Sequence, residues 1–388
     1  MESKALELHR KLKGKIEVIS RFAVKNKEDL ALVYTPGVAD ACIQIKNDVS
    51  QSYNLTRRSN LVAVVTDGSA VLGLGNIGPE AAMPVMEGKC ALFKEFADID
   101  AFPICIDSQD TDEIVQTVKL ISKSFGGINL EDISAPRCFE IEKRLKEVGD
   151  VPVFHDDQHG TAIVVAAALI NSLKFAGKKF GSVRIVINGA GAAGIAIAEL
   201  LLYMNFGDIV LCDINGILDV NDKTLNSKQK YMCSVTNKSG IKGNLKDALE
   251  GADVFVGVSR GNLVNADMIA LMNSPIVFAM ANPIPEIYPE EAYKGGALIC
   301  GTGRSDYKNQ INNVLAFPGI FRGVLDAGIK NITEDMMKNA AYAIANMVTE
   351  SEIKSGIVIP DAINREVAVK VSEAIKSSNK FFEQNQLN

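Results

Sequence analysis

The sequence predicts an α/β protein with two parts: an N-terminal α/β catalytic domain and a Rossmann-type doubly wound parallel sheet that binds a dinucleotide. Three observations favour this fold class. The 388 residues suffice for two domains, short apolar runs of strand length alternate with helical segments, and a glycine-rich turn follows one of those runs. We expect domains at residues 1–155 and 156–330, with C-terminal helices at 331–388 packing back on the body.

Charge and composition are those of an ordinary globular protein rather than one that binds nucleic acid or membranes. The formal net charge is −6 and tryptophan is absent, which disfavours attraction to nucleic acid or anionic lipid. The longest apolar run, Thr161 to Leu173, is shorter than a membrane span, and the charged N-terminus lacks the apolar core of a secretory signal. The seven cysteines include no CxxC pair, so we expect free thiols in a reducing cytoplasm.

The first half of the chain alternates helical segments with short apolar runs. Runs rich in β-branched residues and bounded by turn residues indicate strands, and apolar residues spaced three or four apart indicate helices. In chain order we predict a helix over 3–20, a helix from about 38, strand 61–66, helix 79–96, strand 99–106, helix 111–125, a helix after 136 and a short strand before 156.

Two residues in this half carry reactive groups in unusual settings. Tyr34 stands directly before a Thr-Pro-Gly turn; such a tyrosine is commonly a half-buried packing residue, and a catalytic role is the alternative. Lys89 follows Gly88 beside the apolar face of the helix predicted over 79–96. A lysine there commonly extends to water, but a desolvated lysine, or one beside another cation, has a lowered pKa and can act as a base.

Two pairs of adjacent carboxylates, Glu131–Asp132 and Asp156–Asp157, each follow an apolar run and precede a helix. One such pair is commonly a helix cap. Like charges aimed at one spot cost energy unless a cation is present, and oxygen ligands from two loops are what Mg²⁺ or Mn²⁺ prefers. His155 and His159 are too few for a zinc centre. The two acidic pairs therefore indicate a magnesium or manganese site.

The most specific motif is a GxGxxG turn between the strand VRIVI and a helix predicted to end near residue 203. Gly189 allows the tight turn, Gly191 lets a pyrophosphate approach, and Gly194 allows close contact between helix and strand. Ala192 and Ala193 lie between the last two glycines, at the helix N-terminus where the phosphates are expected. The motif predicts a dinucleotide site.

Asp213 ends the next strand, IVLCD, 24 residues after Gly189. An acid in this position accepts hydrogen bonds from the ribose hydroxyls of the adenosine. Its charge would repel a 2′-phosphate, and no basic residue follows until Lys223. We therefore expect NAD to be favoured over NADP.

The remaining apolar runs, at 253–258, 275–283 and 297–303, predict further strands of the same parallel sheet. Ligands bind beyond the carboxyl ends of such strands, where Asn282 is found; Asn313 follows in a later loop. Asparagines in loops are often turn formers, but their amides also suit a substrate that carries carboxylates. From Thr333 onward the pattern is helical.

Taken together, these motifs resemble the small bacterial-type malic enzymes, and the resemblance covers roughly residues 15–375. Its most specific pieces are YTPGVA, VTDGSAVLGLGNIGPEAAMPVMEGKCALFKEFADIDAFPIC, INLEDISAPRCFEIE, PVFHDDQHGTA, NGAGAAG and NNVLAFPG. In that family malate is oxidised by a nicotinamide cofactor, and the distal carboxylate leaves as CO₂ to give pyruvate.

The resemblance implies a role for each matching residue. Lys89 would be the general base and Tyr34 the acid that protonates the enolpyruvate carbon, while Asp156 would tune Lys89. The other implied roles are metal binding by Glu131, Asp132 and Asp157, contact with substrate by Asn282 and Asn313, and contact with cofactor by Asn282. The resemblance further implies a homodimer and an active site in a cleft between the domains.

One position departs from the family pattern. Larger malic enzymes carry an arginine two residues after the Asp-Gly of VTDG, where this chain has Ala70. The small forms commonly lack it, so the group that neutralises the distal carboxylate stays open, with Arg137 and Arg21 as candidates. Two alternatives to the malic enzyme reaction also stay open: a malolactic enzyme that uses bound NAD to give lactate, and a non-catalytic nucleotide-binding regulatory protein.

Overall fold

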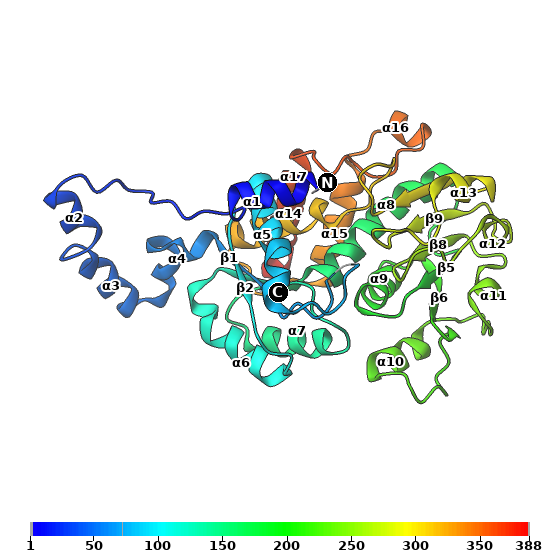
Figure 1. Ribbon diagram of the computed structural model, residues 1–388, viewed down its shortest axis with the longest axis horizontal. Coiled ribbons are helices and arrows are strands. Elements are labelled where there is room, and N and C mark those ends of the chain that lie inside the picture. Colours follow the sequence, from blue (N-terminus) through cyan, green and yellow to red (C-terminus); the bar gives the residue numbers. More distant parts are fainter. Residues whose placement is uncertain (1–2, 72, 387–388) are drawn as a thin grey trace.

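The structure is a computed structural model that describes residues 3–71 and 73–386, with side chains described as far as residue 378. Its helices surround two separate sheets, one of four strands in the order β2-β1-β3-β4 and one of six in the order β10-β9-β8-β5-β6-β7. The two sheets lie in different halves of the body (Figure 1). The predicted α/β class with a Rossmann-type sheet is confirmed.

The first sheet is wholly parallel, and helices connect its strands. β1 occupies the central position and its Val62–Val65 segment is fully buried, as expected for a strand covered on both faces. The strands are β1 (Leu61–Thr66), β2 (Asp100–Cys105), β3 (Gly127–Leu130) and β4 (Val153–His155), and the connecting helices are α5 (Gly78–Ala97), α6 (Thr111–Ile121) and α7 (Arg137–Val148).

The second sheet is parallel except for the short strand β7 at its edge. β5 pairs with β6 on one side and with β8 on the other, so the strand order reverses at β5, and this is where open α/β sheets bind ligands. The strands are β5 (Val183–Asn188), β6 (Gly207–Asp213), β7 (Gly216–Ile217), β8 (Val254–Gly257), β9 (Ile276–Ala279) and β10 (Ile299–Thr302); the helices are α9 (Ala192–Tyr203), α10 (Ser227–Val235), α11 (Leu245–Leu249), α12 (Ala266–Ile269) and α13 (Pro289–Lys294).

Helix α8 (Thr161–Ala176) joins the two halves and is buried without a break from Ala162 to Leu173. It continues a short helical turn at residues 156–160. The helical stretch is therefore longer than the apolar run Thr161 to Leu173, which was expected to be too short to span a membrane. The whole stretch Asp156–Ala176 is long and apolar enough to cross one, but 72% of its most apolar window is buried inside the protein. A helix that is apolar all round is typical of a core, and α8 packs against α9 and α15 (Glu334–Ala345).

The C-terminal helices return to the first half. α17 (Glu366–Gln386) packs on α14 (Phe317–Ala327), on α15 and on α5, and α16 (Glu350–Lys354) lies against α8. Edge-to-face contacts tie α14 to α5 and to the first sheet: the ring of Phe317 lies 4.8 Å from that of Phe93 in α5, and the ring of Phe321 lies 6.0 Å from that of Phe154 in β4. Both halves therefore share one large apolar core.

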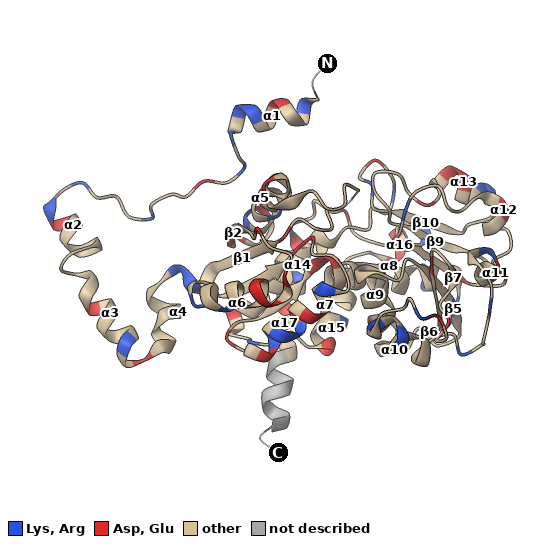
Figure 2. Cartoon of the chain, turned by 60° about the horizontal axis from the view of Figure 1, so that its bottom comes forward, with Lys and Arg blue, Asp and Glu red and all other residues tan. Residues whose placement is uncertain are grey.

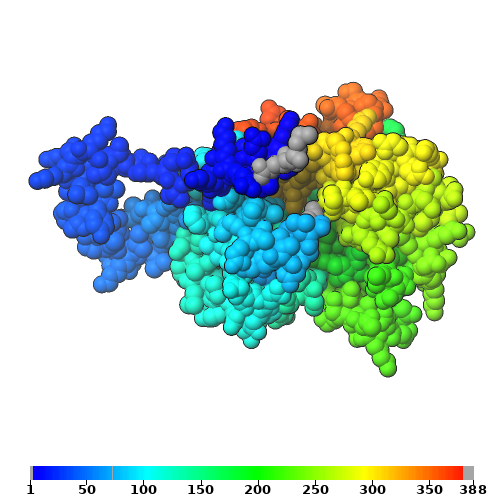
Figure 3. Space-filling view, in the orientation of Figure 1, coloured from blue at the N-terminus to red at the C-terminus, as the bar shows by residue number. Residues whose placement is uncertain are grey.

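The N-terminal helix is shorter than predicted. α1 spans only Lys4–Leu12, because Lys13 adopts the left-handed conformation and ends it. We call residues 17–50 the N-terminal arm; it contains α2 (Lys27–Val33) and α3 (Val38–Asn47) and leads to the short helix α4 (Ser52–Leu55). The arm projects from the body in every view (Figures 1, 2 and 3), and none of its residues is buried.

Candidate active site

Two acidic pairs meet at one edge of the first sheet. Glu131 and Asp132 follow β3, while Asp156 and Asp157 follow β4, and these two strands are parallel neighbours. The carboxyl ends of parallel strands lie at the same edge of a sheet, so both pairs face one space. The predicted grouping of the two loops is therefore present in the fold.

Lys89, from α5, points into the same space and is only 8% exposed, so it does not extend to water. Its Nζ lies 2.5 Å from Asp156 Oδ2 and 3.0 Å from Glu131 Oε1, and it lies 4.2 Å from the ring centre of Phe317. Burial lowers the pKa of Lys89, but the charges of Asp156 and Glu131 outweigh burial and raise the pKa above its ordinary value. The amine is held in its charged form.

Asp156 is fully buried and its position is fixed from two sides. Its Oδ2 accepts a 2.5 Å hydrogen bond from Asn313 Nδ2 in addition to the Lys89 contact. Residues 156–160 form a π-helical turn, which brings Gly160 so close that an added Cβ would lie 1.9 Å from Asp156 Oδ1. Asn313 therefore holds Asp156 in this structure, a contact that the sequence did not indicate.

Glu131, Asp132 and Asp157 each offer an oxygen, and the three oxygens lie within 4.8 Å of one another. Asp132 Oδ2 is buried and has no hydrogen-bond partner among the described residues. For all three groups burial is the largest cause of a raised pKa, and repulsion between the neighbouring carboxylates adds to it. A divalent cation would satisfy the unpartnered oxygen and offset this repulsion, so the residues fit a hard metal ion.

Hydrogen bonds orient these oxygens. The Asp132 backbone, at a φ of 54°, donates through its N–H to Asp157 Oδ2 at 2.7 Å, and Asn129 Nδ2 donates to Glu131 Oε2 at 2.9 Å. On the far side of the same turn, His159 Nε2 lies 2.8 Å from the buried Glu142 of α7. The loop after β4 is thus braced against both β3 and α7.

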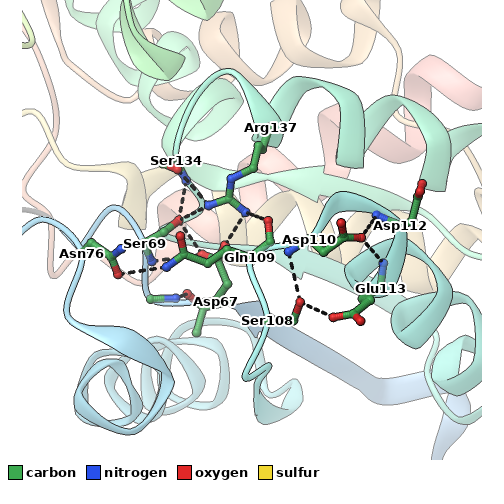
Figure 4. Close-up of polar contacts among 12 residues, drawn as sticks. Asp67, Ser69, Asn76, Ser108, Gln109, Asp110, Asp112, Glu113, Ser134 and Arg137 are labelled. Atoms are coloured by element: carbon green, nitrogen blue, oxygen red, sulfur yellow. Dashed lines mark hydrogen bonds and ion pairs between the residues drawn. The ribbon is translucent and has the colours of Figure 1, made fainter.

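Arg137 is engaged elsewhere, so the structure does not leave it free to bind a substrate carboxylate. Its guanidinium donates to Asp67 Oδ2 at 2.8 Å and to the hydroxyls of Ser69 and Ser134 at 2.9 Å each (Figure 4). It also donates to the carbonyl of Gln109. Arg137 therefore fastens the loop after β1 to the loop after β3. Arg21, the other candidate, lies exposed on the N-terminal arm.

Tyr34 is not brought to Lys89 within one chain. It caps α2 on the N-terminal arm and is 66% exposed, and the arm stands away from the sheet edge that carries the acidic pairs (Figure 1). The role of Tyr34 in the site therefore stays a prediction. Sequence patterns locate Tyr34 in an element, but they do not show what that element packs against.

A second cavity, of about 810 Å³, lies at the carboxyl end of β5 and is lined by Gly189, Gly191 and Asp213. Each glycine has the predicted geometry. An added Cβ on Gly189 would lie 2.6 Å from Val258 O and one on Gly194 only 1.7 Å from Gly189 O, whereas Gly191 faces open space. α9 begins at Ala192 and Ala193, so its N-terminus points to the place where a pyrophosphate binds.

Two cationic side chains also line this cavity. Lys246 from α11 and Arg260 from the loop after β8 both line it, and neither is ion-paired among the described residues. Asp213 keeps one oxygen available, because only Oδ1 accepts a bond, from the Asn215 N–H at 2.7 Å. Arg260 follows the strand predicted at 253–258, at the end of the sheet where the sequence places ligand binding; Lys246 has no such local signal and was not predicted.

Asn282 follows β9 and lies between the two halves. An added Cβ on Gly303 would lie 2.6 Å from Asn282 Nδ2, and one on Gly73, in the loop after β1, would lie 2.9 Å from Asn282 O. The nucleotide-binding half therefore touches the first half through this asparagine. Another cavity, of about 1420 Å³, lies elsewhere, among α7, α9, α10 and α15, and none of Lys89, Glu131, Asp132, Asp156 and Asp157 lines it.

The fold and these residues define a nucleotide-dependent protein whose first half carries a buried lysine beside a carboxylate cluster and whose second half carries a glycine-lined dinucleotide cavity. Comparison with known families agrees: residues 13–146 match the malic enzyme N-terminal domain and residues 158–379 match the malic enzyme NAD-binding domain. The chain belongs to the malic enzyme family, and a nicotinamide cofactor is the ligand of its second half.

Three relatives illustrate the similarity. The chain is 52% identical to a bifunctional malic/malolactic enzyme of Bacillus subtilis over 97% of this chain and 92% of that protein. It is 54% identical to an NAD-dependent malic enzyme of Geobacillus stearothermophilus over 93% and 76%. The crystal structure of an NAD-dependent malic enzyme from Thermotoga maritima superposes with a TM-score of 0.93 at 49% identity, covering 97% and 99%.

The raised pKa values of the three acidic groups predict how metal binding depends on pH. Because burial and mutual repulsion keep protons on Glu131, Asp132 and Asp157 above the usual carboxyl range, a cation must displace protons. Apparent Mn²⁺ affinity should rise with pH near neutrality, and binding should release protons. Calorimetry in buffers of different ionisation enthalpy measures both, and a pH-independent affinity without proton release would contradict the assignment.

Proposed function

We propose that this protein oxidises (S)-malate to pyruvate and CO₂ with reduction of NAD(P). The C2 hydride goes to the nicotinamide, the C2 hydroxyl gives up its proton, and the C3–C4 bond then breaks so that its electrons form an enolate. Protonation at C3 gives pyruvate. The observation that carries the proposal is the buried Lys89 amine beside Asp156 and the Glu131–Asp132–Asp157 cluster, in a chain that also has a dinucleotide cavity.

Glu131, Asp132 and Asp157 are proposed to hold Mn²⁺ or Mg²⁺. When bound, such a cation stabilises negative charge on the C2 oxygen and offsets the carboxylate charges that keep Lys89 protonated. Lys89 is proposed to take the hydroxyl proton, which requires a neutral amine. Asp156, locked by Asn313, fixes where the amine sits, and Asn282 and Asn313 are proposed to contact the substrate, with Asn282 also next to the cofactor.

Tyr34 is proposed to protonate C3 in the site of a second copy of the chain. The N-terminal arm exposes apolar side chains along its length, including Val18 at 82%, Ile19 at 71% and Leu32 at 70% exposure. Several exposed apolar side chains on one projecting segment are typical of a segment that packs on a partner. A homodimer in which each arm packs on the other copy would cover it and supply the acid that each site lacks.

NAD is proposed as the favoured cofactor, because the free oxygen of Asp213 can accept a ribose hydroxyl and would repel a 2′-phosphate. Lys246 and Arg260 line the same cavity, which reduces that repulsion. The relatives include both kinds: a protein named NADP-dependent malic enzyme, from Haemophilus influenzae, is 48% identical over 90% of this chain and 46% of that longer protein. The cytoplasm is proposed as the location, in keeping with seven free cysteines.

Product analysis separates the proposed reaction from its alternatives. With malate, NAD and Mn²⁺, the protein should form pyruvate, CO₂ and NADH in equal amounts, measured by absorbance and chromatography. Lactate without net NADH would instead indicate the malolactic reaction, which the name of the Bacillus subtilis relative makes worth testing. NAD binding without any product would indicate a regulatory protein.

Replacing the buried amine tests the role of Lys89. Lys89→Ala should lower kcat by about 10²–10⁴-fold, the usual contribution of general acid–base catalysis, while NADH still binds, as followed by its fluorescence. Near-normal turnover would exclude Lys89 as the base. Lys338→Ala, on α15 and paired only with a neighbouring exposed acid, is the control and should keep full activity.

Mixing two inactive variants tests the shared site. Tyr34→Phe and Lys89→Ala should each be inactive alone, but a mixed dimer has one site with an intact Lys89 and an intact Tyr34 from the partner. Co-expression should therefore restore about a quarter of the wild-type activity, because random pairing puts the variants together in half of the dimers. If Tyr34 acted within its own chain, the mixture would stay inactive.

Removing the acid at the end of β6 tests the cofactor preference. Asp213→Ala should weaken NAD binding about tenfold, the effect of losing a hydrogen bond to a charged group, and should leave NADP binding unchanged or improved. Titrations with NADH and NADPH fluorescence measure both. An equal loss for the two cofactors would remove the basis for the preference.

A further inference from the structure

The segment after β9 carries a buried carboxylate that the proposed reaction does not use. Glu286 is fully buried, yet no cation lies against its side chain among the described residues. Its Oε1 accepts a 2.9 Å hydrogen bond from the Ser259 N–H, and its Oε2 accepts a 3.0 Å bond from the Ala281 N–H. One carboxylate thus joins the loop after β8 to the loop after β9.

The surrounding chain is shaped around this carboxylate. An added Cβ on Gly257 would lie 2.4 Å from the Glu286 carboxyl carbon, so only glycine leaves room for it at the end of β8. The Glu286 carbonyl accepts the N–H groups of Leu263 and Val264, both at 3.0 Å. Backbone hydrogen bonds therefore join the loop after β8 to the loop after β9, and the Glu286 carboxylate lies between the two loops.

Each of the two loops has a different neighbour. Ser259 and Arg260 line the dinucleotide cavity, and the Ser259 hydroxyl accepts a 2.8 Å bond from Asn188 Nδ2 at the end of β5. Asn282 directly follows Ala281 and lies against Gly73 of the first half. Because Glu286 joins the two loops, a ligand that orders the loop after β8 would also order the loop after β9.

We infer that Glu286 is a positioning residue that couples nucleotide binding at the loop after β8 to the placement of Asn282 at the junction of the two halves. This inference rests on the proposed function, because it takes the cavity as the cofactor site and Asn282 as a substrate contact. Glu286 itself does not line the dinucleotide cavity. A glutamate is suited to this task because both of its oxygens accept hydrogen bonds; a glutamine has only one accepting oxygen.

Hydrogen–deuterium exchange with ADP-ribose as the probe tests the coupling. ADP-ribose lacks the nicotinamide, so it occupies the adenosine and diphosphate positions without reaching the substrate. In the wild-type protein it should slow exchange both in a peptide covering 189–194 and in one covering 281–286. In Glu286→Gln it should slow exchange at 189–194 alone. Glu290→Gln, an exposed acid on α13, is the matched control and should behave as the wild type.

Steady-state kinetics gives a second readout. Glu286→Gln should raise the KM for malate on the order of 10-fold, as expected for a displaced substrate contact, and Glu290→Gln should not. Protection at 189–194 without protection at 281–286 in the wild-type protein overturns the inference. This measurement on the wild-type protein tests the inference even if Glu286→Gln does not fold. Retained protection of both segments in Glu286→Gln also overturns it. No protection at 189–194 would instead refute the cofactor site, and with it the proposed function.

Discussion

The charge of Lys89 is the constraint on which the rest of the site depends. A buried ammonium group is stable only beside counter-charges, and Asp156 and Glu131 provide them at 2.5 and 3.0 Å. Those carboxylates belong to a group of four that would repel one another without positive charge. Lysine and acids therefore stabilise one another, a divalent cation would offset the remaining repulsion, and the adjacent parallel strands β3 and β4 bring the two acidic loops together.

Residues outside the lysine–carboxylate group hold its loops in position. Asn313 and Gly160 set the position of Asp156, and Arg137 fastens the loops after β1 and β3. On the nucleotide side, Asn282 reaches the first half at Gly73. The two halves share an apolar core, and near the site their loops meet at the contact of Asn282 with Gly73. This arrangement is suited to bringing a nicotinamide and a hydroxy acid together. The N-terminal arm, by contrast, has no buried residue among those that the structure describes.

Sequence patterns predicted the parts of the site that follow from local structure. The two acidic pairs and the glycine turn stand directly after strands, and the ends of parallel strands meet, so their grouping could be foreseen. Contacts between distant segments could not: Lys246, Glu286 and the Asn313–Asp156 bond depend on how separate loops pack. The length of the helical stretch Asp156–Ala176 and the early end of α1 depended on backbone conformations that the sequence left open. Tyr34 was singled out by family resemblance, and no local pattern in the sequence showed that it would stand exposed at the end of α2.

A crystal structure with Mn²⁺, NADH and oxalate, a stable analogue of the enolate, tests the central claim most directly. Anomalous scattering at the manganese edge should place the ion between Glu131, Asp132 and Asp157, with the Lys89 amine within hydrogen-bonding distance of the bound oxalate. Tyr34 from a second copy should approach the same ligand. Manganese bound away from these three carboxylates, or oxalate bound out of reach of Lys89, would contradict the account.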